Sequence, residues 1–511
     1  MEKSRKKRAQ APAYVSPKQM TIGGFESPFE RSLDPNNRWV VLAHLIPWDD
    51  IASHYIKVVG IKSTGRPGLS PRVIIGALMI KHLGNLDDRE TVAQISENIY
   101  MQYFLGYPGF STEEPFDASL FVEIRKRLGA DSINAINDRI VQLRAGSDSY
   151  RHAKDNSNDD VDDNDDQNGS GSSNQTNNNG RVLYDATACP QDIAFPTDLN
   201  LLNDSREKLE EIIDELYDPE LHEKKPRTYR EVARTDYLHT AQKKKKTAKE
   251  IRKAVKKQLA YVSRDLKSIN ALLDKYKRIP LQKMEHRYLL VINTLYEQQK
   301  HMFETRTHSV EDRIVSIHQP HVRPIVRGKA QAKVEFGAKI HLSLVNGLAY
   351  LDELSWDAFN EGSHLENYVE QFRKRHGHYP AEVLADKIYC TRANRAMLKE
   401  RNIKLVAKPL GRPSAVSNHV SPGERNPIEG KFGQGKTAYG LNRIKARLKG
   451  TSESWIASII LVLNLVKLAG EAPLCLIISV LSSFSALKLK VLQEINLVMR
   501  KMFFCPHVIQ I

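Results

Sequence analysis

Residues 181–190 read RVLYDATACP, and residues 381–390 read AEVLADKIYC. In each segment three or more mainly apolar residues precede an aspartate, Asp185 in the first and Asp386 in the second. Apolar runs of this kind are typical of buried strands, and a carboxylate at the end of a buried strand is held rigidly. We therefore expect two strands of an α/β core, each of which presents one aspartate.

A third acid lies in the segment RNPIEGKFGQGKT, where Arg425, Glu429 and Lys436 have the spacing R-x3-E-x6-K. The Asn-Pro pair before Glu429 suits the cap and first turn of a helix. Three carboxylates suit Mg²⁺ or Mn²⁺, because these hard cations prefer oxygen ligands. Two such ions, about 4 Å apart, can activate a nucleophilic oxygen and stabilise the leaving oxygen of a phosphodiester. The three acids together predict a metal site for cutting DNA, although each acid alone could be an ordinary surface residue.

Around these acids the chain resembles the DDE transposases of bacterial insertion sequences, in particular the group with the signature Y-x2-R-x3-E-x6-K. The resemblance covers most of the chain from about Trp39 to Leu468. It is carried by the segments VLYDATACPQDIAFPTDLNLL, VLADKIYC and IEGKFGQGKTAYGLNRIKARLKGTSESWIASIILVLNLVKL. One position departs from the pattern, because the tyrosine of the signature falls at Pro422.

The resemblance implies that Asp185, Asp386 and Glu429 are the catalytic and metal-binding acids, holding two Mg²⁺ ions for which Mn²⁺ can substitute. It implies that Arg425 and Lys436 contact DNA beside them. The implied fold is α/β, a ribonuclease H-like catalytic core with a helical insertion, preceded by an all-α N-terminal domain. The implied reaction is cleavage at the element ends, which are terminal inverted repeats, followed by strand transfer into target DNA. The implied assembly is a homodimer or higher oligomer on double-stranded DNA, in the bacterial or archaeal cytoplasm and associated with the nucleoid.

Two other classes of function remain open. One is a related metal-dependent nuclease that does not transfer strands, and the other is an inactive, transposase-derived DNA-binding protein.

A nucleotide-binding pattern overlaps the third acid's helix: Gly430–Thr437 reads GKFGQGKT and satisfies G-x4-G-K-T. A phosphate-binding loop of that kind must follow a buried strand, and the polar segment SNHVSPGERNPIE precedes this one. We therefore expect no nucleotide as a partner.

Charge supports a polyanionic partner. The chain has 511 residues and a formal net charge of +15, which allows several domains and favours nucleic acid. Residues 224–287 hold 21 Lys or Arg against 6 Asp or Glu, so this region alone has a net charge of +15. It lies in a block, at about 201–315, that interrupts the core. We expect it to contact DNA, although a Lys-rich helix can also be a solvated face.

The expected domain organisation has five parts. They are a basic disordered tail (1–27), a helical N-terminal domain (28–145), a disordered linker rich in acidic residues, Asn, Gly and Ser (146–180), the catalytic domain with its insertion (181–470), and a C-terminal helical tail (471–511). In the insertion we expect helices at 205–217, 248–277 and 281–305. The resemblance assigns recognition of element ends to the N-terminal domain, whereas its residues alone fit dimerisation or packing equally well. Its candidate phosphate contacts are Arg72, Lys81, Arg125, Lys126 and Arg127.

Further elements are expected from local signals. A hairpin is predicted at 333–350, with Asn346-Gly347 as its turn and His341 solvated on the polar side of an edge-like strand. Ser363 with Glu366 predicts the start of a helix that closes near Gly377. Thr391 predicts another helix start, and IKLVAKP predicts a last strand.

Four cysteines without a CxxC pair suggest a reducing compartment. The apolar segment near the C-terminus, IASIILVLNLVKLAGEAPLCLIISVL, is interrupted by Lys467, Glu471 and Pro473. The pieces between these interruptions are too short to cross a bilayer, so buried helices and no membrane association are expected.

Overall fold

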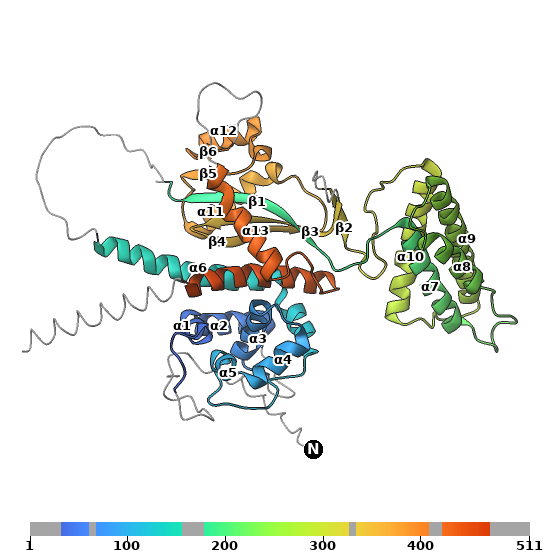
Figure 1. Ribbon diagram of the computed structural model, residues 1–511, viewed down its shortest axis with the longest axis horizontal. Coiled ribbons are helices and arrows are strands. Elements are labelled where there is room, and N and C mark those ends of the chain that lie inside the picture. Colours follow the sequence, from blue (N-terminus) through green and yellow to red (C-terminus); the bar gives the residue numbers. More distant parts are fainter. Residues whose placement is uncertain (1–31, 61–67, 156–177, 327–333, 408–421, 471–511) are drawn as a thin grey trace, which may run out of the picture. The chain divides into compact units, whose positions relative to one another are not determined.

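The computed structural model describes residues 32–60, 68–155, 178–326, 334–407 and 422–470 (Figure 1). The chain divides into two compact units, residues 1–164 with 460–511 and residues 165–459, and each is described here by itself. The predicted tails at 1–27 and 471–511 lie outside the described residues, as does most of the predicted linker. Helix α6, however, continues to Asp155, beyond the predicted start of that linker at 146.

The regular secondary structure of the first unit up to Asp155 is helical, as predicted. The helices are α1 (Arg38–Leu45), α2 (Trp48–Val59), α3 (Pro71–Leu83), α4 (Asp88–Glu97), α5 (Ile99–Leu105) and α6 (Leu120–Asp155). Asp87 caps α4, because its carboxylate accepts a hydrogen bond from the Glu90 amide at 2.8 Å. Asn98 then ends α4 and caps α5, so the apolar stretch that follows Asp87 forms two helices.

Three of the five candidate phosphate contacts in this unit are internal residues. Arg72, Lys81 and Arg125 are 2%, 1% and 4% exposed. Arg72 donates hydrogen bonds to backbone carbonyls of α5, whereas Lys81 and Arg125 both form ion pairs with Asp88. The expectation that these three cations reach DNA phosphates is therefore wrong in this structure, because the fold already uses their charge. The two exposed candidates are Lys126 and Arg127.

The second unit is built on a mixed six-stranded sheet. Its strands are β1 (Arg181–Pro190), β2 (Arg323–Val326), β3 (Val334–Val345), β4 (Leu348–Ser355), β5 (Glu382–Leu384) and β6 (Lys404–Val406). The order is β2-β3-β1-β5-β6, and β4 also pairs with β3. Strand β3 is antiparallel to β1, β2 and β4, whereas β1, β5 and β6 run parallel. The result is a mixed α/β unit whose two acid-bearing segments belong to its parallel half.

The predicted hairpin is confirmed, but the prediction for one of its residues is wrong. Asn346 and Gly347 have φ values of 50° and 75°, the left-handed pair of a type I′ turn. His341 is 0% exposed and therefore not solvated. The reason is that β3 is a central strand covered on both faces, and on the predicted polar face the ring of Tyr368 stacks on His341.

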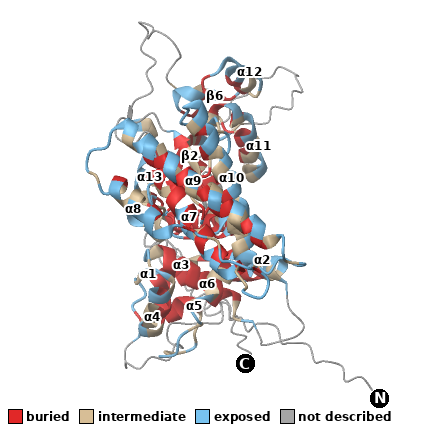
Figure 2. Cartoon of the chain, turned by 90° about the vertical axis from the view of Figure 1, so that its right-hand side faces the viewer, coloured by how far each residue is buried: buried red, intermediate tan, exposed pale blue. Residues whose placement is uncertain are grey.

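Helices and 3-10 turns follow the strands of the sheet (Figure 1), and the helices labelled in Figure 2 carry both buried and exposed residues. The elements that follow the strands are the 3-10 turns η3 (Glu361–His364), η4 (Lys387–Tyr389) and η5 (Pro422–Arg425), and the helices α11 (Leu365–His376), α12 (Arg392–Glu400) and α13 (Asn426–Ala438). The predicted cap at Thr391 and the predicted stop at Gly377 are confirmed. Ser363 lies in η3 and does not cap α11, whose N-cap is His364.

One helix among the described residues, Lys449–Gly470, is long and apolar enough to cross a membrane by length and composition. Within its most apolar window, 72% of the residues are buried inside the protein. A core helix passes the same test, which agrees with the expectation of a buried helix for this part of the chain.

The insertion between β1 and β2 is a helical bundle. It contains α7 (Asp198–Leu216), α8 (Arg230–Ala241), α9 (Ala248–Leu273) and α10 (Lys283–Thr305). Three of these helices were expected, with α7 starting earlier than predicted because Thr197 caps it. Helix α8 was not expected, because it buries only Ala233 and Thr240 and so has almost no apolar periodicity.

A buried charge cluster lies between α7 and α9. Asp265 of α9 is 1% exposed, and neither of its carboxylate oxygens has a hydrogen-bond partner among the described residues. Glu210 and Arg206 of α7 lie beside it and form an ion pair with each other. Burial, and then the charge of Glu210, raise the pKa of Asp265 to about 7, although Arg206, Arg264 and Arg230 oppose the rise. The folded insertion therefore favours a protonated Asp265.

We expect the insertion to lose stability as the pH rises from about 4 to about 7, because the pKa of Asp265 is raised from 3.8 to about 7 in the folded chain and the unfolded chain loses this proton first. Asp265→Asn should remove about 2–4 kcal/mol of this pH-dependent fall in the free energy of unfolding. Hydrogen exchange of α7 and α9 in the full chain, corrected for the intrinsic effect of pH, measures it. Asp274→Asn, at the exposed C-cap of α9, is the control, and equal pH profiles for the two variants would contradict the expectation.

Candidate active site

The sheet register places two of the predicted acids side by side. Strands β1 and β5 are parallel neighbours in which Leu183 lies opposite Leu384. Asp185 and Asp386 each follow this pair by two residues, and neighbouring strands lie about 4.8 Å apart. The two aspartates therefore occupy the same level of adjacent chain segments, although they are far apart in the sequence.

Local hydrogen bonds orient both carboxylates. One oxygen of Asp185 accepts from the amide of Ala186 at 2.8 Å. Asp386 ends its strand segment as the N-cap of η4 and accepts from the amide of Lys387 at 2.7 Å. Each side chain is thus fixed by the backbone of the next residue before any longer-range contact is made.

Arg425 joins the two aspartates. Its guanidinium nitrogens lie 3.1 Å from Asp185 Oδ2 and 3.3 Å from Asp386 Oδ1. The side chains of Asp185 and Arg425 are 19% and 21% exposed, whereas Asp386 is 54% exposed. Burial raises the pKa of Asp185, Arg425 and the Ala186 amide oppose this rise, and Asp386 and Glu361 add to it. At Asp185 the effect of burial on the pKa therefore outweighs the opposing effect of the Arg425 charge.

Helix α13 carries the rest of the signature and packs against β1. Arg425 is its N-cap and Glu429 lies in its first turn. At about 100° per residue, positions 425, 429 and 436 fall within about 40° of one another, so the spacing R-x3-E-x6-K describes one helix face. Lys436 lies in the last turn of the helix and is half-buried.

The structure brings together two of the three acids. Glu429 is exposed, and no hydrogen bond or ion pair of its side chain is found among the described residues. Within the same residues, no group of three or more His, Cys, Asp or Glu side chains lies close enough to hold a metal ion. Asp185, Asp386 and Arg425 therefore form the assembled part of the site, with Glu429 one helical turn beyond Arg425.

Two segments of the chain match known protein families. Residues 27–127 match the family described as "Transposase domain (DUF772)", and residues 383–466 match the "Transposase DDE domain". The second match contains Asp386, Arg425, Glu429 and Lys436, whereas Asp185 precedes it. Both matches support a DDE transposase of the insertion-sequence type.

A curated relative of the transposase is the "Uncharacterized protein ORF8 in nfe locus" of Rhizobium meliloti. The two are 29% identical over 180 residues, which is 35% of this chain and 73% of the relative. No solved structure was found to match the chain.

The transposase also has charged residues near Asp185 that sequence reasoning missed. Glu361 of η3 contributes to the raised pKa of Asp185 and forms an ion pair with Lys339 of β3. Lys339 also donates to the backbone carbonyl of Phe359 at 2.6 Å. Glu361 comes from a segment with no strand signal before it, so the sequence offered no reason to place it near the aspartates.

A buried polar network supports the strand next to Asp185. The side chain of Asp352 in β4 is 0% exposed and pairs with Arg375 at 2.5 Å. It also accepts from Ser343 at 3.0 Å and, at the same distance, from His341 Nδ1. The His341 ring stacks on Tyr368 with a centroid distance of 3.6 Å. His341 lies opposite Ala186, the residue after Asp185, so this network fixes the strand pair that carries the first aspartate.

The core contains two buried cysteines, Cys189 and Cys390, which are not joined by a disulfide. They follow Asp185 and Asp386 at equal spacing and are 0% and 2% exposed. Buried cysteines of this kind pack as small apolar side chains.

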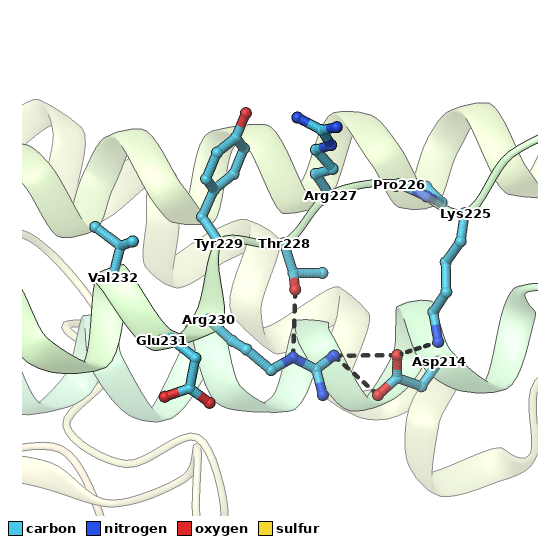
Figure 3. Close-up of a pocket in the computed structure, with 9 residues that line it drawn as sticks. All are labelled: Asp214, Lys225, Pro226, Arg227, Thr228, Tyr229, Arg230, Glu231 and Val232. Carbon is cyan, nitrogen blue, oxygen red and sulfur yellow. Dashed lines mark hydrogen bonds and ion pairs between the residues drawn. The ribbon is translucent and has the colours of Figure 1, made fainter.

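A separate cavity lies on the insertion, between the end of α7 and the start of α8 (Figure 3). It encloses about 510 Å³ and is lined by residues of 225–232 together with Asp214. Asp214 accepts from Arg230 at 2.9 Å and pairs with Lys225 at 2.8 Å. These ion pairs join the end of α7 to the segment that leads into α8. None of the candidate catalytic residues lines the cavity.

We expect Asp352→Asn to destabilise the transposase by about 3 kcal/mol, because it leaves Arg375 without its buried counter-charge. Thermal or denaturant unfolding of the full chain measures the loss. Asp357→Asn, at a residue whose side chain is 76% exposed, is the matched control and should change the stability by less than about 0.5 kcal/mol. Equal stabilities of the two variants would show that the network does not hold β3 and β4 together.

Proposed function

We propose that this transposase binds the terminal inverted repeats of its element, cuts the DNA at the element ends and joins the cut ends to target DNA. Asp185, Asp386 and Glu429 are the proposed catalytic acids. The observation that carries the proposal is the equal level of Asp185 and Asp386 on neighbouring parallel chain segments, with Arg425 between them. A mixed sheet, flanking helices and acids on adjacent strands support a ribonuclease H-like core.

The chemistry of the two aspartates fits a hard divalent cation. Their oxygens are the ligands that Mg²⁺ and Mn²⁺ prefer, and the raised pKa of Asp185 indicates a site that additional positive charge would stabilise. Asp185 and Asp386 would hold two such ions, and Glu429 would complete the ligand set from α13. Bound there, the ions supply activation of a water or 3′-hydroxyl oxygen and stabilisation of the leaving oxygen.

The remaining residues of the site act on the substrate. Arg425 and Lys436 share one face of α13 with Glu429 and hold phosphate oxygens beside the acids, which offsets the charge that develops in the reaction. The buried network of Asp352 holds the strand that carries Asp185. A rigid strand keeps the carboxylate in position when DNA binds.

The insertion provides a second DNA contact. The basic residues of α9 that are exposed repeat along its solvent face, over about 27 Å. They are Lys249, Arg252, Lys253, Lys256, Lys257, Arg264 and Lys267. Among the residues that the structure describes, Lys257 is the member of this stripe with an acidic partner, Asp236 at 2.6 Å. An unneutralised stripe of this length fits a duplex backbone, because binding phosphates there releases counterions.

The assembly and location proposed for the transposase follow from this reaction. Two element ends must be held together during strand transfer, which supports a homodimer or higher oligomer on DNA. The N-terminal unit is proposed to recognise the ends, and the protein to act in the cytoplasm at the nucleoid. The alternative, a nuclease without strand transfer, predicts cut ends that are never joined to a second DNA.

Replacing Glu429 by Gln should abolish cleavage, by at least about a thousandfold, and leave DNA binding unchanged, because the amide keeps the shape and removes the charged ligand. Nicking of a plasmid that carries the element ends, in Mg²⁺ or Mn²⁺, measures cleavage. Glu424→Gln is the control, since Glu424 lies in η5 and pairs with Arg181. Cleavage retained in Glu429→Gln would defeat the assignment.

Charge reversal on the α9 stripe should weaken binding of any duplex. We expect Lys253→Glu with Lys256→Glu to lower affinity by at least about tenfold at moderate salt, and to reduce the salt dependence of binding. Fluorescence anisotropy with a duplex of random sequence measures both. Lys300→Glu, at an exposed position on α10, is the control for charge alone, and an equal effect per charge in the two variants would exclude a specific role for α9.

A further inference from the structure

Helix α12 carries three cations along one edge of its exposed face. Arg392, Arg395 and Lys399 are all exposed, and at about 100° per residue their positions fall within about 60° of one another. The opposite face of the helix is buried through Asn394 and Leu398. The three cations therefore form one stripe, about 10 Å long, on the side of α12 that faces solvent.

The fold does not neutralise this stripe. Within the residues that the structure describes, no ion pair involves Arg392, Arg395 or Lys399. Arg395 lies beside the thiol of Cys390 and opposes the rise in its pKa that burial causes. By contrast Arg401, just after the helix, is paired with Glu366 at 2.7 Å and belongs to the packing of α11.

The exposed acid of α12 does not lie on the same edge of the helix as the three cations. Glu400 is the exposed acid of α12, and it falls about 80° from Arg392 around the helix axis. The small side chains of Ala393 and Ala396 are exposed beside the cations. A backbone that approaches the stripe therefore meets positive charge and little steric obstruction.

The position of the stripe is fixed relative to Asp386. The segment from Asp386 to Arg392 is short enough to keep their Cα atoms within about 20 Å. The buried amide of Asn394 donates to the carbonyls of Tyr389 at 2.9 Å and Gly362 at 2.6 Å. These bonds fasten the start of α12 to η4, the turn that Asp386 caps, and to η3, so the place where the stripe begins is fixed relative to the second aspartate.

We propose that the α12 stripe binds consecutive phosphates of duplex DNA next to the scissile phosphate. This rests on the proposed function in one respect, since it places the scissile phosphate at Asp386. Phosphates of one strand repeat about every 3.4 Å along the duplex axis but also wind around it, so their separation in space is wider and a stripe of about 10 Å faces about two of them. Because phosphate contacts position DNA without reading its sequence, the stripe sets the path of the duplex at the site and not its sequence preference.

The test compares two double variants of the full chain that lose equal charge. Arg392→Ala with Lys399→Ala removes both ends of the stripe, and Lys374→Ala with Lys300→Ala removes exposed lysines from α11 and α10. The probe is a random-sequence duplex of about 30 base pairs, titrated from about 50 to 200 mM salt. We expect the slope of log K against log salt to fall by about 2 in the α12 variant, since each phosphate contact contributes about 0.9, and to stay unchanged in the control. Equal slopes in the two variants would overturn the proposal.

A second measurement tests the position of the stripe. At protein concentrations that saturate plasmid DNA, we expect the α12 variant to nick at least about tenfold more slowly than the control, because a misplaced duplex loses its alignment with the acids. A changed salt slope with unchanged nicking would place the stripe elsewhere on the DNA and overturn the proposal.

The proposed function is tested separately by Glu429→Gln, which should keep the wild-type salt slope while nicking is lost. If the wild-type protein bound DNA but never cut it, the proposed function would fail. The salt slope would still decide whether α12 binds phosphates.

Discussion

Two carboxylates at the same level of neighbouring parallel chain segments repel each other, and the structure of the second unit is organised around offsetting that repulsion. The register of β1 and β5 leaves Asp185 and Asp386 about one strand spacing apart, where two like charges at the protein surface oppose each other by several kcal/mol. Arg425 supplies the nearest counter-charge and draws the start of α13 against β1. The same guanidinium therefore holds the N-terminus of α13 beside the two aspartates and fixes the position of the helix that carries Glu429 and Lys436.

Around this pair, polar groups that are fully buried take the place of an apolar core. Strand β3 is covered on both faces, and its residues His341 and Ser343 reach Asp352, which also holds Arg375. Losing one partner of such a network costs more than the whole network contributes relative to apolar packing. The network is therefore better understood as fixing one arrangement of β3 against β1 than as a source of stability. The insertion leaves the sheet after β1 and returns at β2, on the far side of β3 from β1, so a large helical block is accommodated without interrupting the strands that carry the acids.

Sequence patterns predicted the parts of the structure in which one local rule acts alone. The I′ turn at Asn346-Gly347 and the cap at Thr391 follow from side chains within a few residues of one another. The adjacency of Asp185 and Asp386 was expected from two apolar runs and from a family resemblance, whereas the bridging by Arg425 and the nearness of Glu361 depend on contacts between residues far apart in the chain. His341 was misplaced for the same reason: alternation in β3 gave no sign that both faces of the strand would be covered. Helix α8 was missed because it buries too few apolar side chains to leave a periodic signal.

The distribution of cations separates two uses of positive charge that composition alone does not distinguish. Arg72, Lys81, Arg125 and Arg375 are internal and paired with carbonyls or carboxylates, so their charge is already used by the fold. The cations of α9 and α12 are exposed and largely unpaired among the described residues, and each group repeats at the spacing of one helix face. A net charge of +15 does not say where a polyanion binds. Exposed, largely unpaired cations on one face of a helix define a surface along which a DNA backbone can lie. The signature on α13 follows the same pattern on a smaller scale, because Arg425 and Lys436 share a helix face with Glu429, the acid of the triad that has no ion pair among the described residues.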